Sequence, residues 1–72
     1  MNNRYLIVIE RAGRNYSAYA PDLPGCAATG LTVAETENRM REAIELHIAG
    51  LREDKLPVPH PEAVAGFVSL EA

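Results

Sequence analysis

Alternating and clustered apolar positions predict three short strands in the first part of the chain. The segment "RYLIVIE", residues 4–10, is rich in β-branched and aromatic residues and has apolar side chains at both odd and even positions. This pattern is typical of a central strand that is covered on both faces. The turn residues Gly13 and Asn15 precede "YSAYAP", residues 16–21, so the first two strands should form a hairpin. After the prolines and Gly25, the small residues of "CAATG" predict a third strand that ends at Gly30.

The strongest periodic signal predicts a helix from Val33 to about Asp54. Thr32 is followed three residues later by Glu35, which is the capping-box pattern of a helix start, and no proline interrupts the run. Leu46 lies on a flank of this helix, as an isolated exposed leucine of the kind common on protein surfaces. Apolar positions at helical three- and four-residue steps form the inner face, and they are Val33, Thr36, Met40, Ala43, Ile44, Ile48 and Leu51.

A proline-rich segment and a last strand follow the helix. "KLPVPHP", residues 55–61, must be extended because its three prolines cannot continue a helix. In "GFVSLEA", Phe67, Ser69 and Glu71 alternate with Val68 and Leu70, which suits a strand. The order β-β-β-α-β predicts an α+β, two-layer fold with a mixed four-stranded sheet in the order 3-2-1-4 and one long helix on one face.

Composition narrows the class of protein. The 72 residues predict a single domain, residues 1–72, near the lower limit for a self-sufficient core. Its only cysteine, Cys26, excludes an internal disulfide or a multi-cysteine metal site. No apolar run approaches the ~18 residues of a membrane span, and the N-terminal run is too short for a signal peptide. We therefore expect a soluble, cytoplasmic protein.

Charge and surface pattern favour a protein partner over a nucleic acid. The net charge is −3, and acidic residues concentrate between residues 35 and 54, so the chain has no basic footprint for a phosphate backbone. A basic protein is the better electrostatic match. One helix can cover only one face of the sheet. Tyr5, Tyr16, Tyr19 and other apolar groups of the strands are therefore expected on the opposite face. The sequence therefore predicts a homo-oligomer, a dimer or larger.

The stretch "YSAYAPDLPGCAATGLTVAETENRMREAIELHIAGLREDKLPVPHP" resembles the HicB family of antitoxins from HicA–HicB toxin–antitoxin modules. It has a loop with proline and aspartate that ends in Gly-Cys, then a short strand, a Gly-x-Thr helix start, Glu-Ala-Ile in mid-helix and Pro-x-Pro after the helix. These motifs cover residues 4–61. The resemblance implies a partial ribonuclease-H-like fold, which agrees with the predicted strand order.

The resemblance also implies a function. A HicB-like antitoxin binds HicA, a small toxin of double-stranded-RNA-binding fold that cleaves messenger RNA with a histidine, and occludes its active surface. Many members carry a further DNA-binding domain at the C-terminus; the chain ends at Ala72 without one, so we expect no direct DNA binding. The candidate toxin contacts are Asp22, Leu23, Pro24, Gly25, Cys26, Glu35 and Glu42. Of these, Asp22 and Leu23 are expected to be exposed in the loop, and Glu35 and Glu42 to point outward from the helix. The alternative is an orphan, self-assembling structural or regulatory domain without a toxin.

Two positions depart from the family pattern. Thr36 stands where the family usually has alanine after the helix-start glutamate, and it removes no group that the fold needs. Lys55 stands where the family usually has glycine after the helix. Lysine adopts the positive φ of a left-handed helix cap less readily than glycine does.

Enzymatic alternatives find little support in the sequence. A metal-dependent nuclease of ribonuclease-H type needs several converging carboxylates, and the first strand offers only Glu10, at its end. Cys26 as a nucleophile needs a base, and only His47 and His60 are available. The three tyrosines are better explained by core or dimer packing than by base stacking. We therefore expect a non-enzymatic protein with no metal, cofactor or catalytic residue.

Overall fold

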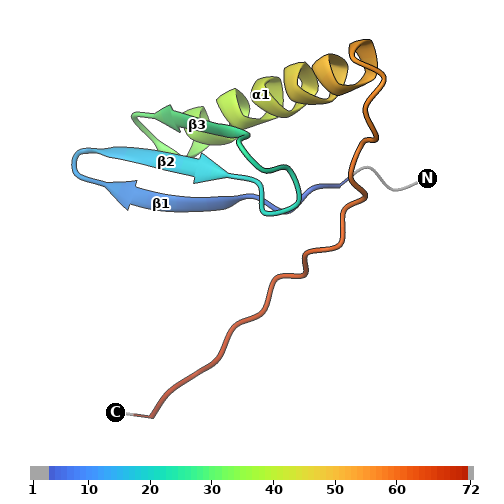
Figure 1. Ribbon diagram of the computed structural model, residues 1–72. Helices are drawn as coiled ribbons and strands as arrows, with labels where there is room; N and C mark the ends of the chain where they lie inside the picture. Colours follow the sequence, from blue (N-terminus) through green and yellow to red (C-terminus); the bar gives the residue numbers. More distant parts are fainter. Residues whose placement is uncertain (1–3, 72) are drawn as a thin grey trace.

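A computed structural model describes residues 4–71 and shows a small sheet beside one long helix (Figure 1). The strands are β1 (Val8–Ala12), β2 (Asn15–Tyr19) and β3 (Ala27–Gly30), and the helix is α1 (Val33–Glu53). The sheet is antiparallel with the order β1-β2-β3. The predicted hairpin, third strand, helix and α+β class are confirmed, with strand bounds that differ by up to four residues.

Two glycines shape the turns between the strands. Gly13 has φ +64° in the tight turn from β1 to β2, and Gly25 has φ +85° at the end of the loop before β3. Both angles lie in the left-handed region, where a residue without a Cβ atom is favoured. The loop is closed by backbone hydrogen bonds from Leu23 N–H to Ala20 O at 3.0 Å and from Cys26 N–H to Leu23 O at 3.0 Å. The loop is therefore a compact corner.

The start of α1 has the predicted cap. Thr32 Oγ1 accepts a hydrogen bond from Glu35 N–H at 3.0 Å, and the Glu35 carboxylate accepts one from Leu31 N–H at 3.2 Å. Gly30 lies directly beneath this first turn, because an added Cβ atom would lie 2.5 Å from Thr36 Oγ1 and 2.8 Å from Thr36 N. The close approach of β3 to the helix therefore requires glycine at this position.

The end of α1 is capped in the left-handed conformation despite its lysine. Lys55 has φ +57°. Its N–H donates to Arg52 O at 3.1 Å, and Leu56 N–H donates to Leu51 O at 2.8 Å, which together form a Schellman motif. The left-handed conformation is thus kept at this position, where the resemblance leads us to expect glycine, although the Cβ atom of lysine makes it sterically unfavourable.

The core lies between α1 and the sheet. Leu23, Met40 and Thr36 are fully buried, and Ala18, Ala20 and Cys26 are nearly so. Ile9, Ala18 and Ala28 are paired across the sheet and face the helix. The predicted inner face of α1 is confirmed at its centre, while Val33, at its first position, is 45% exposed. The helix packs mainly on β3 and β2 and only slightly on β1.

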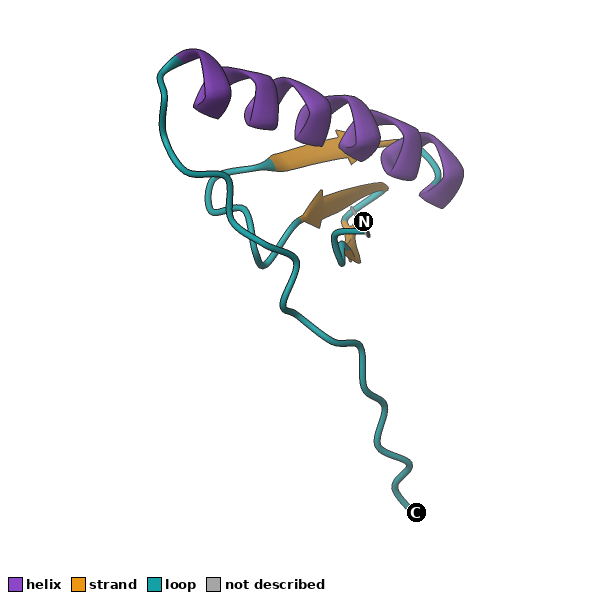
Figure 2. Cartoon of the chain, turned by 90° about the vertical axis from the view of Figure 1, so that its right-hand side faces the viewer, coloured by secondary structure: helices purple, strands orange, loops and turns teal. Residues whose placement is uncertain are grey.

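The predicted fourth strand is absent from the sheet of residues 4–71. Residues 56–71, called the arm from here on, are extended and carry no strand assignment. In both views the arm leaves the body and ends far from it (Figures 1 and 2). Consequently β1, which was expected to be central, is an edge strand. The alternation of apolar residues shows only that this segment could pack as a strand. The prediction was wrong because a strand also needs a neighbour to pair with, and the segment pairs with no sheet edge of the same chain.

Candidate functional site

The loop of residues 21–26 holds the arm against the body. Asp22 Oδ2 accepts hydrogen bonds from Glu62 N–H at 3.1 Å and Ala63 N–H at 3.0 Å. These two bonds join parts of the chain that are forty residues apart, and both use a charged acceptor, which makes them stronger than neutral ones. Asp22 was expected to contact a partner, and in this structure its carboxylate binds the arm.

The other loop residues divide into buried and exposed ones. Leu23 is 0% exposed and Cys26 is 4% exposed, so the expectation that Leu23 is an exposed residue was wrong. The exposed positions are Pro21, Pro24 and Gly25. The loop can therefore offer a partner its Pro-Gly tip, while the side chains on either side of the tip anchor it in the core.

Cys26 has the surroundings of a packed thiol. Burial raises the pKa of this thiol above its ordinary value, which lowers the fraction of thiolate at neutral pH. Since the thiolate is the nucleophile, these surroundings make the side chain less reactive. The side chain contributes to the core beneath α1 together with Met40 and Ala18.

One exposed stripe runs along the outside of α1. Glu35 and Glu42 are seven residues apart, which places them on the same side of the helix. Glu35 also bonds the helix start and pairs with Arg39 at 3.3 Å, whereas Glu42 is exposed. Leu46, one turn further, is 75% exposed. The outer stripe is defined by Glu35, Glu42, Leu46 and Glu53; Arg39, the ion-pair partner of Glu35, lies on the same side of the helix.

From the sequence alone, Leu46 was expected to be an isolated exposed leucine. Its spacing of four residues from Glu42 and seven from Glu53 was the available signal that it lies at the centre of an acidic stripe. An exposed apolar side chain among charged ones can anchor a contact when a partner excludes water from it. Leu46 is therefore a candidate contact that the sequence analysis missed.

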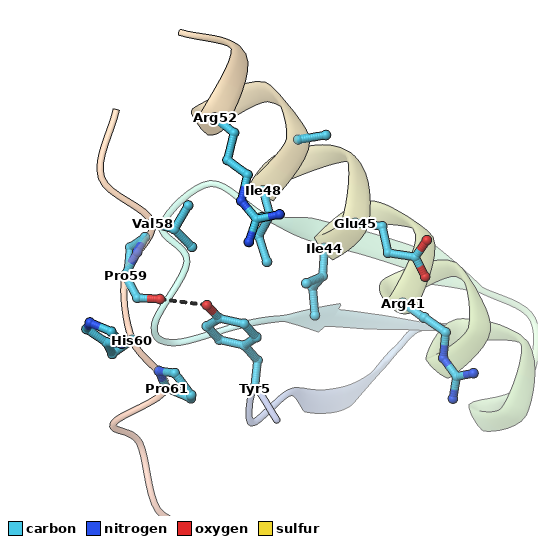
Figure 3. Close-up of a pocket in the computed structure, with 11 residues that line it drawn as sticks. Tyr5, Arg41, Ile44, Glu45, Ile48, Arg52, Val58, Pro59, His60 and Pro61 are labelled. Carbon is cyan, nitrogen blue, oxygen red and sulfur yellow. Dashed lines mark hydrogen bonds between the residues drawn. The ribbon is translucent and has the colours of Figure 1, made fainter. Parts of the chain in front are cut away.

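A groove separates α1 from the arm (Figure 3). It has a volume of about 610 Å³, and Ile44, Ile48 and Val58 form apolar parts of its wall. Tyr5 lies at its base, and its hydroxyl donates a hydrogen bond to Pro59 O at 2.6 Å. This bond is a second attachment of the arm to the body. The sequence analysis expected Tyr5 to face the other side of the sheet, and the structure shows it packed toward the core.

Charged groups line the same groove. Arg41, Glu45 and Arg52 come from one side of α1, and His60 lies opposite them on the arm. The two arginines make this side of the helix more basic than the outer stripe. The helix therefore presents two different surfaces, an acidic stripe that faces solvent and a mixed groove that faces the arm.

Two kinds of feature were not found among the described residues, a metal-binding group of side chains and a membrane-spanning helix. Within residues 4–71 no three histidine, cysteine, aspartate or glutamate side chains are grouped so that they could hold a metal ion. Glu10 is exposed on β1 and is paired across the sheet with Ser17. In the same part of the chain, no helix has the length and apolar character needed to cross a membrane.

Comparisons with known proteins identify relatives of modest similarity. A 14.9 kDa protein from the rep-hol intergenic region of Haemophilus phage HP1 is 34% identical over 90% of this chain and 49% of its own length. A UPF0150 protein of Helicobacter pylori is 39% identical over 68% of each chain. A UPF0150 protein of Synechocystis is 33% identical over 92% of this chain and 85% of its own length. The chain thus spans about half the length of the phage relative.

The family assignment comes from a different comparison. No solved structure matches the chain. A family model described as the HicB-like antitoxin of bacterial toxin–antitoxin systems matches residues 5–71. This match includes the loop of residues 21–26, the capped helix and the arm, which together form the outer stripe and the groove. The chain belongs to the HicB-like antitoxin family.

Proposed function

We propose that this protein binds and neutralises a HicA-type, messenger-RNA-cleaving toxin by covering the toxin's active surface. The observation that carries the proposal is the family match over residues 5–71, because the family is that of antitoxins of bacterial toxin–antitoxin systems. The partner acts on messenger RNA, so we place the complex in the bacterial cytoplasm. The order of three strands and a helix is compatible with the partial ribonuclease-H-like fold that we propose for the complete domain.

The outer stripe supports this function through its charge and its shape. A toxin that binds RNA needs a basic surface, and acidic side chains such as Glu42 steer such a surface toward α1. Leu46 is the large apolar side chain at the centre of the stripe, and its burial in a pocket of the partner, surrounded by a rim that excludes water, would add affinity. We therefore assign steering to Glu42 and anchoring to Leu46.

The Pro-Asp loop provides a second contact in this proposal. Pro24 and Gly25 are exposed at its tip, and the positive φ of Gly25 leaves the backbone open to a close approach. Asp22, Leu23 and Cys26 act indirectly, since they hold the tip in place through the arm and the core. Glu35 contributes mainly by fixing the start of α1.

The test is co-expression with a short basic protein from the adjacent reading frame. We expect the antitoxin to restore growth that this protein arrests, and the two proteins to co-purify. Glu42→Arg should weaken binding by roughly tenfold or more, about 1.4 kcal/mol, and Leu46→Ser should have a similar effect.

Glu10→Arg is the matched control, because it makes the same change of charge at an exposed site on β1, away from the outer stripe. We expect it to bind the toxin almost as well as the parent protein. Equal losses for Glu42→Arg and Glu10→Arg would show that only net charge matters and would remove the outer stripe from the proposal. Absence of both rescue and binding would contradict the antitoxin function and favour a self-assembling domain without a toxin.

A further inference from the structure

The end of the arm is an apolar strand sequence without a covering surface in this chain. Phe67 is 97% exposed, Val68 is 86% exposed and Leu70 is 88% exposed. Consecutive side chains alternate between two sides of an extended chain, so Val68 and Leu70 lie on one side and Phe67 lies on the other. Contiguous exposed apolar groups of this kind mark an interaction site more often than open surface.

Within the described residues, the sheet has a free edge at β1 that could accept such a strand. This strand pairs with β2 along one edge, and in residues 4–71 its other edge has no strand partner. A free edge offers a row of backbone donors and acceptors to another strand. The helix extends only slightly over β1, so Ile44 and Ile48 remain half-exposed on the groove wall.

Two attachments hold the first half of the arm against the body, where residues 60–65 and residues 4–7 line one pocket. Tyr5 holds Pro59, and Asp22 holds the backbone of Glu62 and Ala63. Beyond these anchors the chain continues outward from the body (Figures 1 and 2). The arm is thus bound to the body up to residue 63, while residues 66–71 extend beyond these bonds.

Charge favours a meeting of these two elements. Arg4, Arg11 and Arg14 surround β1 and outnumber Glu10, so this part of the chain is basic. The arm has no lysine or arginine and carries Glu62 and Glu71. Opposite charges on the two elements favour their association and oppose the pairing of two arms or of two β1 edges.

We propose that residues 66–71 of one copy add as a fourth strand to the free β1 edge of a second copy, and that the exchange is reciprocal within a dimer. In this arrangement Val68 and Leu70 face the helix side of the sheet, near Ile44 and Ile48. Phe67 faces the open side, where Leu6 and Val8 lie because their neighbours Ile7 and Ile9 face the core. The proposal goes beyond toxin binding and does not rest on it.

Sedimentation of the full chain over micromolar to high-micromolar concentrations tests the dimer. We expect a monomer–dimer equilibrium for the parent protein and a monomer for the double variant Phe67→Ser/Leu70→Ser. This variant should remain folded, because both side chains are almost fully exposed in the single chain. Leu46→Ser is the matched control: it removes an equally apolar, exposed side chain from α1 and should leave the dimer intact.

An isotope-filtered NMR experiment identifies the chain that accepts the arm. In a mixture of labelled and unlabelled protein, we expect intermolecular contacts between the Phe67 ring and the side chains of β1. Contacts found only within one chain would show that the arm folds back onto its own sheet, and would overturn the proposal. It would also be overturned by a parent protein that is monomeric at every concentration, or by a dimer that survives Phe67→Ser/Leu70→Ser. A parent monomer whose toxin binding is lost in that variant would instead assign the arm to the toxin.

Discussion

The third strand and the end of the arm form an instructive pair. β3 is "AATG", a weak strand sequence, yet it is paired with β2 and lies beneath α1. Residues 67–70, "FVSL", have much higher strand propensity and pair with nothing in the described chain. Strand formation was therefore decided by the availability of a paired edge and a covering helix rather than by intrinsic preference. Small residues fit beneath the helix, and large ones would not.

The largest expected difference between these regions is in stability. Leu23→Ala empties a fully buried site and should lower the free energy of unfolding by about 2–5 kcal/mol, enough to unfold most of so small a domain. The matched change Leu70→Ala removes the same atoms from the exposed arm and should alter monomer stability by less than about 0.5 kcal/mol. Denaturant titration of dilute samples measures both. A large loss for Leu70→Ala in the monomer would show that the arm belongs to the core.

A pair of glycines sharpens the comparison at the helix. Gly30→Ala forces a Cβ atom into the first turn of α1, 2.5 Å from Thr36 Oγ1, and should cost about 1–3 kcal/mol. Gly50→Ala meets open space in the middle of the last helical turns and should stabilise the protein by about 0.5–1 kcal/mol. Thermal unfolding of the two variants should therefore shift in opposite directions. Equal shifts would contradict the close packing of β3 on the helix.

A smaller effect, an increase in stability, is expected from a substitution at the end of α1, where the two regions join. Lys55 adopts φ +57° in the cap that ends α1, so Lys55→Gly should gain about 0.5–1 kcal/mol after the entropic cost of glycine is counted. Lys55→Ala is the control, since it removes the long side chain and keeps the unfavourable backbone angle. A gain in both variants would trace the effect to the lysine charge instead of the backbone.

The smallest expected effect is a pH dependence of the folding stability, which arises in the core and not in the arm. Because burial raises the pKa of the Cys26 thiol, the folded state holds its proton at pH values where the unfolded state has lost it. This contribution to stability is complete below the unfolded pKa, about 8.5, and is lost as the pH rises through the folded value. Cys26→Ala should reduce the fall in stability above pH 8, and an unchanged fall would place its origin elsewhere.

Local signals in the sequence were sufficient for much of the body. The Thr32 and Glu35 pair marked the helix start, and Gly25 marked the corner before β3, because each acts through short-range hydrogen bonds or backbone angles. The fourth strand could not be predicted in the same way. Its place depends on Asp22 and Tyr5, which bond to backbone groups about forty and fifty residues away, and no local pattern specifies such contacts.

The candidate site was predicted less well than the fold. Glu42 was expected on an outward face and is exposed, and the Pro-Gly tip of the loop is also open. Leu23 was misplaced because a leucine between two prolines gives no periodicity from which burial can be inferred. Leu46 was expected to be exposed and is 75% exposed; its proposed role as a contact depends on acidic neighbours one and two turns away.

The central claim is that this domain silences a toxin by covering its active surface. The most direct measurement is messenger-RNA cleavage by the purified basic partner as the antitoxin is added in increasing amounts. We predict that cleavage falls in proportion to the complex formed and is abolished at saturation, and that Glu42→Arg requires more protein for the same inhibition. Cleavage that continues unchanged in the presence of a saturated complex would contradict the claim.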